Sequence, residues 1–331
     1  MIRYGIIGTG WIAKAFVDGT LLGEEMRLAA VCSRDASRGE AFAAPYGGAV
    51  VYTDPAAMAE SDIDAVYIAS PNFLHPAQAR LFLEHGKHVI CEKPITVIPE
   101  ELEELQALAR SRGLVYLEAI MMMHLPARQA LREAVSKIGR VTTAHLDFSQ
   151  LSSKYPAYLA GQNPNIFNPA CCTGSLMDLG IYCVYPALDL FGMPEGISAS
   201  AGFLNTGADG WGTAVLQYPG LQVTLTWSKV GQARQGSQIL GDEGTVTVQS
   251  ISCLTGITRF ERDGTAHPVW GEEQKATLMG AEASDFCRYI QNPADAHYQL
   301  CQTRALEVSR VMAEIRRLAE ISFPGYEEAM T

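Results

Sequence analysis

The sequence predicts an α/β protein that begins with a doubly wound parallel sheet and continues into a second α/β domain with a large, open and mainly antiparallel sheet. Two observations predict this class. Across residues 1–120, short runs rich in Val and Ile alternate with segments of helical spacing, a pattern typical of parallel strands joined by crossover helices. Beyond Met121 the pattern changes to longer segments with a period of two, which indicates antiparallel strands.

The expected strands of the first domain are separated by helices. They lie at residues 4–7, 28–33, 50–52, 65–70, 88–92 and 114–119. The fifth strand runs into Pro94, which has no amide donor and cannot continue a central strand. The strand therefore ends with Glu92 and Lys93 at its tip.

The second domain is expected to begin with a helix over residues 126–137 and a strand at 141–148. The pair Pro219-Gly220 between two alternating runs indicates a hairpin turn. Residues 152–174 show little periodicity, which predicts a long surface loop. We place the boundary between the domains at 121/122, giving domains 1–121 and 122–331, and expect a closing amphipathic helix at 302–321 that can pack back on the first domain.

Composition excludes several classes of protein. The chain has 331 residues, enough for two domains, and a net charge of −11, which argues against a nucleic-acid partner. The eight cysteines form neither a CxxC motif nor a Cys/His spacing, so we expect reduced thiols and no metal site. The start of the sequence lacks a signal peptide pattern and no apolar run approaches ~20 residues. The sequence therefore predicts a cytoplasmic protein without membrane contact.

The turn after the first strand predicts dinucleotide binding. Gly8 permits a tight turn, Gly10 lets backbone amides approach a pyrophosphate, and Ala13 keeps the following helix close to the sheet. This is the Rossmann pattern, and its place between a strand and a helix makes it more than a common Gly-rich turn. The residues between these positions, Thr9, Trp11 and Ile12, are expected to contact the cofactor as well.

The end of the second strand favours NADP. NAD-binding domains usually place an acidic residue here for the adenosine ribose, whereas this chain has Ser33 and Arg34 at the tip and Arg38 four residues later. A guanidinium suits a phosphate dianion. NAD stays possible because Asp35 lies close by, and the two arginines could instead belong to an exposed helix start.

The fourth and fifth strands complete the predicted cofactor site. In an open parallel sheet, ligands gather outside the carboxyl ends of the strands. The residues at these ends are Ser70, Pro71, Asn72, His75, Glu92 and Lys93. His75 could equally be a helix-cap histidine, and we assign it no catalytic role.

Together these motifs resemble the glucose-fructose oxidoreductase, inositol dehydrogenase and rhizopine-catabolism (Gfo/Idh/MocA) family, and the stretches "LEAIMMMHLPA" and "MDLGIYCV" look similar to its dimeric dihydrodiol dehydrogenase branch. The resemblance spans the whole chain. It implies a Rossmann domain, a second domain whose open sheet forms a dimer contact, and a lysine beside the nicotinamide and the substrate hydroxyl. That lysine corresponds to Lys93, and its bond to Pro94 is often cis in such proteins.

The resemblance also implies catalytic roles for two residues four positions apart. Tyr182 would exchange the proton of the reacting oxygen, and Asp178 would bind a neighbouring hydroxyl or orient the site. Many family members have His where this chain has Tyr182, and a buried structural tyrosine is the alternative. Met123 stands where many have an arginine, which leaves the polarity of the substrate pocket open.

The expected function is NADP-dependent hydride transfer between the nicotinamide and a hydroxyl or carbonyl carbon of a small polyhydroxylated substrate. An aldose or sugar derivative is the first expectation and a trans-dihydrodiol the second, with a homodimer formed through the second domain's sheet. The alternatives are an NAD-dependent glycosidase on the same scaffold and a non-catalytic NAD(P)-binding regulator. The presence of both Lys93 and Tyr182 argues against the regulator.

Overall fold

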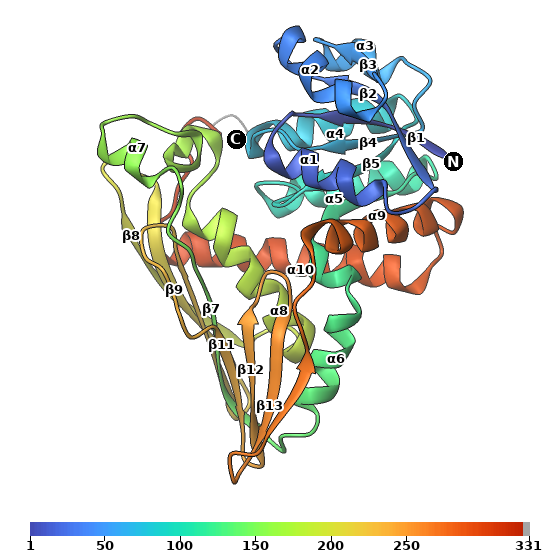
Figure 1. Cartoon of the computed structure of the whole chain (residues 1–331). Coiled ribbons are helices and arrows are strands. Elements are labelled where there is room, and N and C mark those ends of the chain that lie inside the picture. The colour runs from blue at the N-terminus through green and yellow to red at the C-terminus, as the bar shows by residue number, and fades with distance from the viewer. Residues whose placement is uncertain (327–331) are drawn as a thin grey trace. The chain divides into compact units, whose positions relative to one another are not determined.

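The chain folds into two compact units, seen in a computed structural model that describes residues 1–326 (Figure 1). The first unit joins Met1–His124 with Glu273–Leu306, and the second joins Leu125–Glu272 with the described residues from Glu307 on. The sequence predicts a second domain of residues 122–331, with the closing helix 302–321 able to pack back on the first domain. Residues 273–306 instead return to the first unit, because helical spacing shows that a helix has an apolar face but not which core that face covers.

The first unit contains a parallel sheet of six strands in the order β3-β2-β1-β4-β5-β6. Its strands are β1 (Ile2–Ile7), β2 (Met26–Cys32), β3 (Val50–Tyr52), β4 (Ala65–Ile68), β5 (His88–Glu92) and β6 (Tyr116–Ala119). All five strand pairings are parallel. The fold class predicted from the alternating pattern is therefore confirmed, and every predicted strand of this domain is present.

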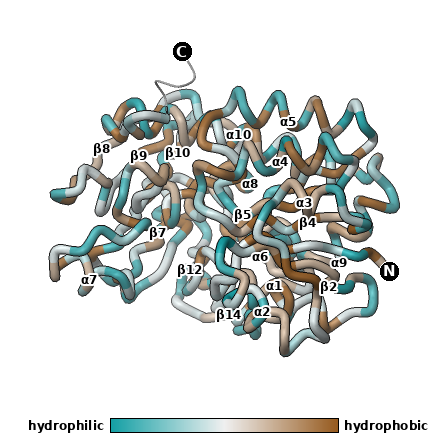
Figure 2. The backbone as a smooth tube through the Cα atoms, turned by 90° about the horizontal axis from the view of Figure 1, so that it is seen from above, coloured by the Kyte–Doolittle hydropathy of each residue, from teal (hydrophilic) through white to brown (hydrophobic). Residues whose placement is uncertain are grey.

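Helices cover both faces of this sheet. They are α1 (Trp11–Thr20), α2 (Ala36–Ala43), α3 (Pro55–Ala59), α4 (His75–Glu84), α5 (Pro99–Ser111) and the returning α9 (Lys275–Gln291). Helix α5 alternates hydrophobic and hydrophilic residues along its length, as expected for a helix with one face on the core (Figure 2). On the other face of the sheet, Phe16 of α1 stacks on Tyr67 of β4 with ring centroids 3.8 Å apart.

The second unit contains a sheet of eight strands in the order β14-β13-β12-β11-β7-β10-β9-β8. Its strands are β7 (Val141–Ser149), β8 (Gly196–Phe203), β9 (Asp209–Tyr218), β10 (Leu221–Ser228), β11 (Ser237–Gly241), β12 (Gly244–Ser250), β13 (Thr255–Glu261) and β14 (Ala266–Trp270). Only the pairing of β10 with β7 is parallel. The expected hairpin joins β9 to β10, and Gly220 adopts a φ of 71°, which favours glycine.

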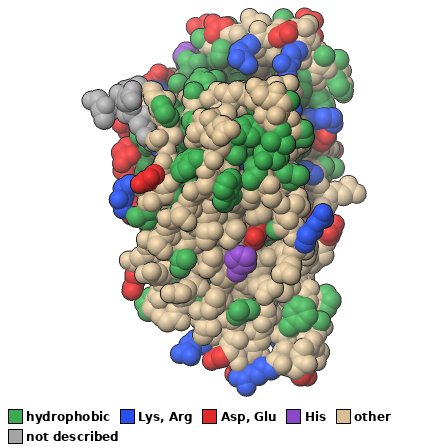
Figure 3. Space-filling view, turned by 90° about the vertical axis from the view of Figure 1, so that its left-hand side faces the viewer, with side chains coloured by type: hydrophobic (Ala, Val, Ile, Leu, Met, Phe, Trp, Pro, Cys, Tyr) green, Lys and Arg blue, Asp and Glu red, His purple; other side chains and the backbone are tan. Residues whose placement is uncertain are grey.

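Helices α6 (Pro126–Val135) and α8 (Ile181–Phe191) pack on one face of this second sheet. The side chains that face them, such as Ala144, Leu225 and Trp227, are buried. The strands leave the other face open, and Figure 3 shows it with uncharged side chains over most of its area. The long helix α10 (Ala296–Leu318) begins in the first unit and continues into the second.

The segment expected to be a long surface loop contains short helical turns. Helix α7 (Tyr155–Leu159) is followed by 3₁₀ turns at Asn165–Phe167 and Pro169–Cys171. The segment builds a small aromatic core of its own, because Phe167 is buried and its ring lies 5.6 Å from that of Tyr158. Periodicity does not reveal such an arrangement, since each helical turn is too short to show a stripe.

Among the described residues, no helix combines the length and apolar character needed to cross a membrane.

Candidate active site

The turn between β1 and α1 has the geometry that a pyrophosphate needs. Gly8 adopts a φ of 100°, and a Cβ there would lie 2.5 Å from the carbonyl oxygen of Ala69. Gly10 is the N-cap residue of α1, where no side chain caps the helix and a Cβ would meet nothing within 4 Å. The first amides of α1 are thus left for an anion, which the helix dipole also favours.

The neighbouring turn residues differ in exposure. Trp11 is 73% exposed, Thr9 and Ile12 are half-buried, and the Lys275 ammonium lies 5.8 Å from the centre of the Trp11 indole. Because the indole of Trp11 is so exposed, it offers an apolar face to a ligand at the turn.

The residues at the tip of β2 include two arginines and one aspartate, whose carboxylate already accepts hydrogen bonds from α2. Asp35 caps α2, accepting hydrogen bonds from the amides of Ser37 and Arg38 at 3.0 and 3.3 Å and from the Ser37 hydroxyl at 2.7 Å. Arg34 and Arg38 are exposed, and within residues 1–326 neither side chain has a hydrogen bond or ion pair. Ser33, half-buried, ends the strand beside them. The arrangement leaves guanidinium groups, and not a carboxylate, for the ribose end of a dinucleotide.

His75 links the segment after β4 to the segment after β5. The ring is buried, with Nδ1 2.9 Å from the carbonyl oxygen of Pro94 and Nε2 2.8 Å from that of Ser70. Burial lowers the pKa of His75 below its ordinary value. The Ser70 hydroxyl donates to Gln78 at 2.6 Å, and Pro71 and Asn72 lie half-buried beside it. These contacts indicate a structural role for His75, which links the backbone after β4 to the backbone after β5.

Hydrogen bonds on both sides of Lys93 fix the strand end that carries it. Glu92 is buried and accepts a hydrogen bond from the Tyr67 hydroxyl, and its burial raises the pKa of the carboxyl. The peptide bond between Lys93 and Pro94 is cis, as the family resemblance implied. The next amide, that of Ile95, donates to Glu118 at 2.8 Å. Lys93 itself is half-buried at the carboxyl edge of the sheet, where Gly8, Ser33 and Asn72 also lie.

The second unit carries the other predicted catalytic residues. Asp178 lies in a π-helical turn, Leu176–Gly180, that continues directly into α8, where Tyr182 follows. The two residues therefore lie in one continuous helical segment. The tyrosine ring is half-buried and meets Phe148 edge-on, with centroids 5.4 Å apart. Single π-helical turns occur frequently at functional sites, since they shift side chains relative to a regular helix.

Sequence reasoning missed Lys229, which forms an ion pair with Asp178. Its side chain is only 7% exposed, whereas that of Asp178 is 30% exposed. Backbone hydrogen bonds fix the lysine, since its amide donates to Gly210 and its carbonyl accepts from Ser152, both at 2.9 Å. The one signal in the sequence was a lysine directly after β10, a strand of alternating apolar and polar residues, and this signal did not reveal Asp178 as the partner.

Sequence reasoning also missed Asp209, which anchors the start of the helical segment. This buried carboxylate accepts from the Ser175 hydroxyl at 2.6 Å and from the Leu176 amide at 2.7 Å. Burial raises the pKa of Asp209, although these hydrogen bonds oppose the rise. A Cβ at Gly174 would come 1.8 Å from the Asp209 Oδ1, so only glycine fits there. The position of Asp178 therefore depends on a contact between distant parts of the chain.

Met123 lies in the 3₁₀ turn Met121–His124, and the side chains of this turn are buried. Its thioether is therefore part of the packing of the first unit.

Comparison with known proteins gives matches along nearly the whole chain. Residues 2–119 match the family model described as "Oxidoreductase family, NAD-binding Rossmann fold", and residues 127–247 match "GFO/IDH/MocA C-terminal domain". The scyllo-inositol 2-dehydrogenase (NADP(+)) of Bacillus subtilis is 38% identical over 326 residues, which cover 98% of this chain and 99% of the relative. The trans-1,2-dihydrobenzene-1,2-diol dehydrogenase of Mus musculus is 32% identical, covering 97% and 94%.

Solved structures show the same fold. A 3-ketoreductase from Actinomadura kijaniata, crystallised with NADP and TDP-benzene, matches with a TM-score of 0.84 and 23% identity over 96% of this chain and 98% of its own. The family matches confirm the resemblance found in the sequence motifs. This chain belongs to the Gfo/Idh/MocA family of oxidoreductases, with an NAD-binding Rossmann domain followed by the family's C-terminal domain.

Proposed function

We propose that the protein is an NADP-dependent oxidoreductase that transfers a hydride between the nicotinamide and a hydroxyl-bearing or carbonyl carbon of a small polyhydroxylated compound. The observation that carries this proposal is the position of Lys93. It stands at the carboxyl end of β5, on the same sheet edge as the uncapped glycine turn. Ligands of doubly wound sheets bind at this edge.

The cofactor, when bound, accepts or supplies the hydride. In the oxidative direction the substrate carbon loses a hydride and its hydroxyl loses a proton, leaving a carbonyl. We assign the uptake of that proton to Tyr182 in its phenolate form, and the stabilisation of the negative charge on the reacting oxygen to the Lys93 ammonium. In reduction the same groups act in reverse.

Asp178 and Lys229 suit recognition of a substrate with several hydroxyls. The carboxylate accepts hydrogen bonds and the ammonium donates them, so the pair offers both kinds of partner to neighbouring hydroxyls. We assign Asp178 to substrate binding and Lys229 to positioning its carboxylate. Because the Lys229 side chain is nearly buried, we expect its ammonium to act on the substrate mainly by holding the Asp178 carboxylate in place.

Preference for NADP over NAD rests on the tip of β2. Arg34 and Arg38 have no partner among the described side chains, whereas the carboxylate of Asp35 is already used by the amides of α2. A 2′-phosphate would pair with both guanidinium groups. The Bacillus subtilis relative is named as an NADP(+) enzyme, which agrees with this assignment.

The substrate class is a polyhydroxylated ring, a cyclitol or a sugar. The relatives are named for scyllo-inositol and for a trans-dihydrodiol of benzene, and both substrates carry adjacent hydroxyls on a six-membered ring. A panel of scyllo-inositol, aldoses and a trans-dihydrodiol, assayed with NADP and with NAD by nicotinamide absorbance, tests cofactor and substrate together. Release of an aglycone from a glycoside without net reduction of the cofactor would favour the glycosidase alternative instead.

We also propose a homodimer formed through the open face of the second sheet. The outward residues of β7, β9 and β10 are mostly uncharged, and they include Thr143, Thr213, Gln222, Thr224 and Thr226 as well as the exposed Trp211. Charged side chains lie mainly toward the margins of this face (Figure 3). A broad surface so poor in charge favours association with a second copy. Sedimentation at micromolar concentration tests the proposal, and a monomer would contradict it.

A further inference from the structure

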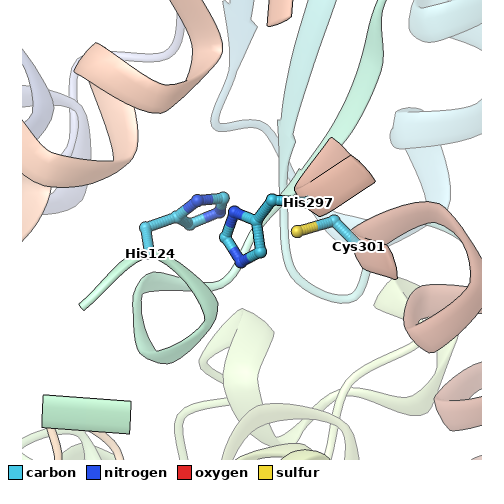
Figure 4. Close-up of side chains that lie close together, drawn as sticks. All are labelled: His124, His297 and Cys301. Atoms are coloured by element: carbon cyan, nitrogen blue, oxygen red, sulfur yellow. The ribbon is translucent and has the colours of Figure 1, made fainter. Parts of the chain in front are cut away.

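The first unit contains a group of metal-ligating side chains apart from the cofactor site. His124, His297 and Cys301 each place one potential ligand atom within 4.8 Å of the other two (Figure 4). We call these three residues the His-His-Cys cluster. His124 ends the 3₁₀ turn after β6, and His297 and Cys301 lie one turn apart on α10. The cluster therefore joins two segments of the first unit that lie far apart in the sequence.

His124 has the orientation of a metal ligand. Its Nδ1 lies 2.9 Å from Oδ2 of Asp285, and since a carboxylate only accepts, Nδ1 carries the hydrogen. Nε2 then has the free lone pair. This atom is buried and has no hydrogen-bond partner among residues 1–326, and the side chain is 0% exposed. A buried acceptor without a partner is unfavourable, and a bound cation would satisfy it.

Asp285 supplies the support that such a ligand requires. Besides His124 it accepts from the Tyr289 hydroxyl at 3.1 Å and pairs with Arg288 at 2.6 Å. Nδ1 of His297 also lies 3.4 Å from Oδ2 of the same carboxylate. Metal-bound histidines commonly donate their other ring nitrogen to a carboxylate in this way, which fixes the tautomer and the ring plane.

The other two members lie beside Tyr289. The hydroxyl of Tyr289 is 2.6 Å from Nδ1 of His297 and 4.0 Å from the sulfur of Cys301. Cys301 is 6% exposed, and Figure 4 shows its sulfur directed toward the His297 ring. Spacing of four residues on a helix keeps an imidazole and a thiol on the same face.

We propose that the His-His-Cys cluster binds a zinc ion. Two imidazoles and one thiolate form a donor set that zinc prefers, with the fourth position filled by water. Bond lengths of about 2.0 to 2.3 Å place tetrahedral ligand atoms roughly 3.3 to 3.8 Å apart. The ligand atoms, which lie within 4.8 Å of one another, would move closer together to reach this spacing, with the Cys301 proton released on binding.

The ion would link two segments of the first unit. The zinc ion would fix the first turns of α10 to the segment after β6, next to the contact in which the Gln302 side chain donates to the Tyr116 carbonyl at 2.5 Å. The sequence predicted no metal site, because it has no CxxC motif and the spacing of His297 and Cys301 was not recognised as a ligand pair. The ligands meet only once the chain returns to the first unit.

Metal analysis of the full-length protein, without a histidine tag, tests the proposal. Protein stripped with EDTA is equilibrated with Zn²⁺ and desalted, and bound metal is measured by mass spectrometry. We expect about one zinc per chain, a rise in Tm on zinc addition and, with Co²⁺ as a probe, a thiolate-to-cobalt absorption band. His124→Gln and Cys301→Ser should weaken zinc binding by about tenfold or more and abolish the Tm response.

The matched control is Cys287→Ser, which removes another buried thiol of the same unit outside the cluster. It should bind zinc as the wild type does. Absence of zinc binding by the wild type, Co²⁺ binding without the sulfur band, uptake of copper but not zinc, or full zinc binding by Cys301→Ser would each overturn the proposal. The cobalt spectrum of the wild type decides the question even if a variant fails to fold.

Discussion

Lys229 and Asp178 form an ion pair that joins the end of β10 to the π-helical turn before α8. The lysine is almost fully buried, so its charge is compensated mainly by this carboxylate. Removing one member of such a pair leaves the other charge poorly compensated. The pair therefore couples the stability of the second unit to the position of a proposed substrate-binding group.

Lys229→Met should lower the free energy of unfolding by roughly 1 to 3 kcal/mol, because the ion pair with Asp178 is lost. It should also raise KM more than it lowers kcat. Urea denaturation and steady-state kinetics measure the two effects. Adding Asp178→Asn should restore stability but not KM. A stable Lys229→Met protein with unchanged KM would show that the pair positions nothing.

Lys93→Met should leave NADP binding largely intact while kcat falls by roughly two or more orders of magnitude, the scale for a lost electrostatic or acid–base group. The measurements are cofactor titration and turnover with the preferred substrate. Lys14→Met serves as the control, because Lys14 is exposed in a surface pair with Asp18 and contributes little. Turnover of folded Lys93→Met within a few-fold of the wild type would end the proposed mechanism.

Tyr182→Phe should reduce kcat by a similar factor, since it removes only the hydroxyl proposed to exchange the proton. If Lys93 and Tyr182 act on the same oxygen, the double variant should lose much less than the product of the two single losses. Tyr218→Phe is the matched control. It removes a hydroxyl that donates to the Gly192 carbonyl at 3.0 Å, and it should leave kcat unchanged. Strictly multiplicative losses would contradict a shared step.

Replacing Arg34 and Arg38 by alanine should weaken NADP far more than NAD, because each lost phosphate pair is worth about 1.5 to 3 kcal/mol. Calorimetric titration with both cofactors measures the difference. Arg27→Ala is the control, an exposed arginine near the amino end of the same strand β2. If the double variant lost equal affinity for the two cofactors, the two arginines would not be binding the 2′-phosphate.

Glu282→Gln should make the protein more stable at neutral pH. Both carboxyl oxygens of Glu282 are buried without a hydrogen-bond partner among the described residues, and burial raises the pKa well above its ordinary value. A carboxyl whose pKa is raised in the folded state binds a proton that the unfolded chain has lost. Its contribution to stability is thus present below about pH 4.3, the unfolded value, and declines as pH rises toward the folded value.

The check is the free energy of unfolding of wild type and Glu282→Gln between pH 4 and pH 8 in metal-free buffer. The wild type should lose stability relative to the variant as pH rises. Glu101→Gln, another largely buried carboxyl of the first unit that accepts from the Val97 amide at 3.4 Å, should not reproduce this gain. Parallel curves for wild type and Glu282→Gln would contradict the buried-acid interpretation.

The sequence by itself determined the order of elements in the first unit. Strand and helix periods, the glycine turn and the stop at Pro94 are local properties, so they identify which residues end each strand. Because all strands of a parallel sheet end at one edge, the sequence also predicted that Gly8, Ser33, Asn72 and Lys93 share that edge. The family motifs supplied the proposed roles of Asp178 and Tyr182.

Only the tertiary structure decided which distant residues meet. The return of α9 to the first unit, the pairing of Lys229 with Asp178 and the anchoring of the π-helical turn by Asp209 are contacts between segments far apart in the chain. The His-His-Cys cluster arises in the same way. Local periodicity specifies which face of an element is apolar, but the partner of a buried charge or a ligand atom is fixed by packing of the whole unit.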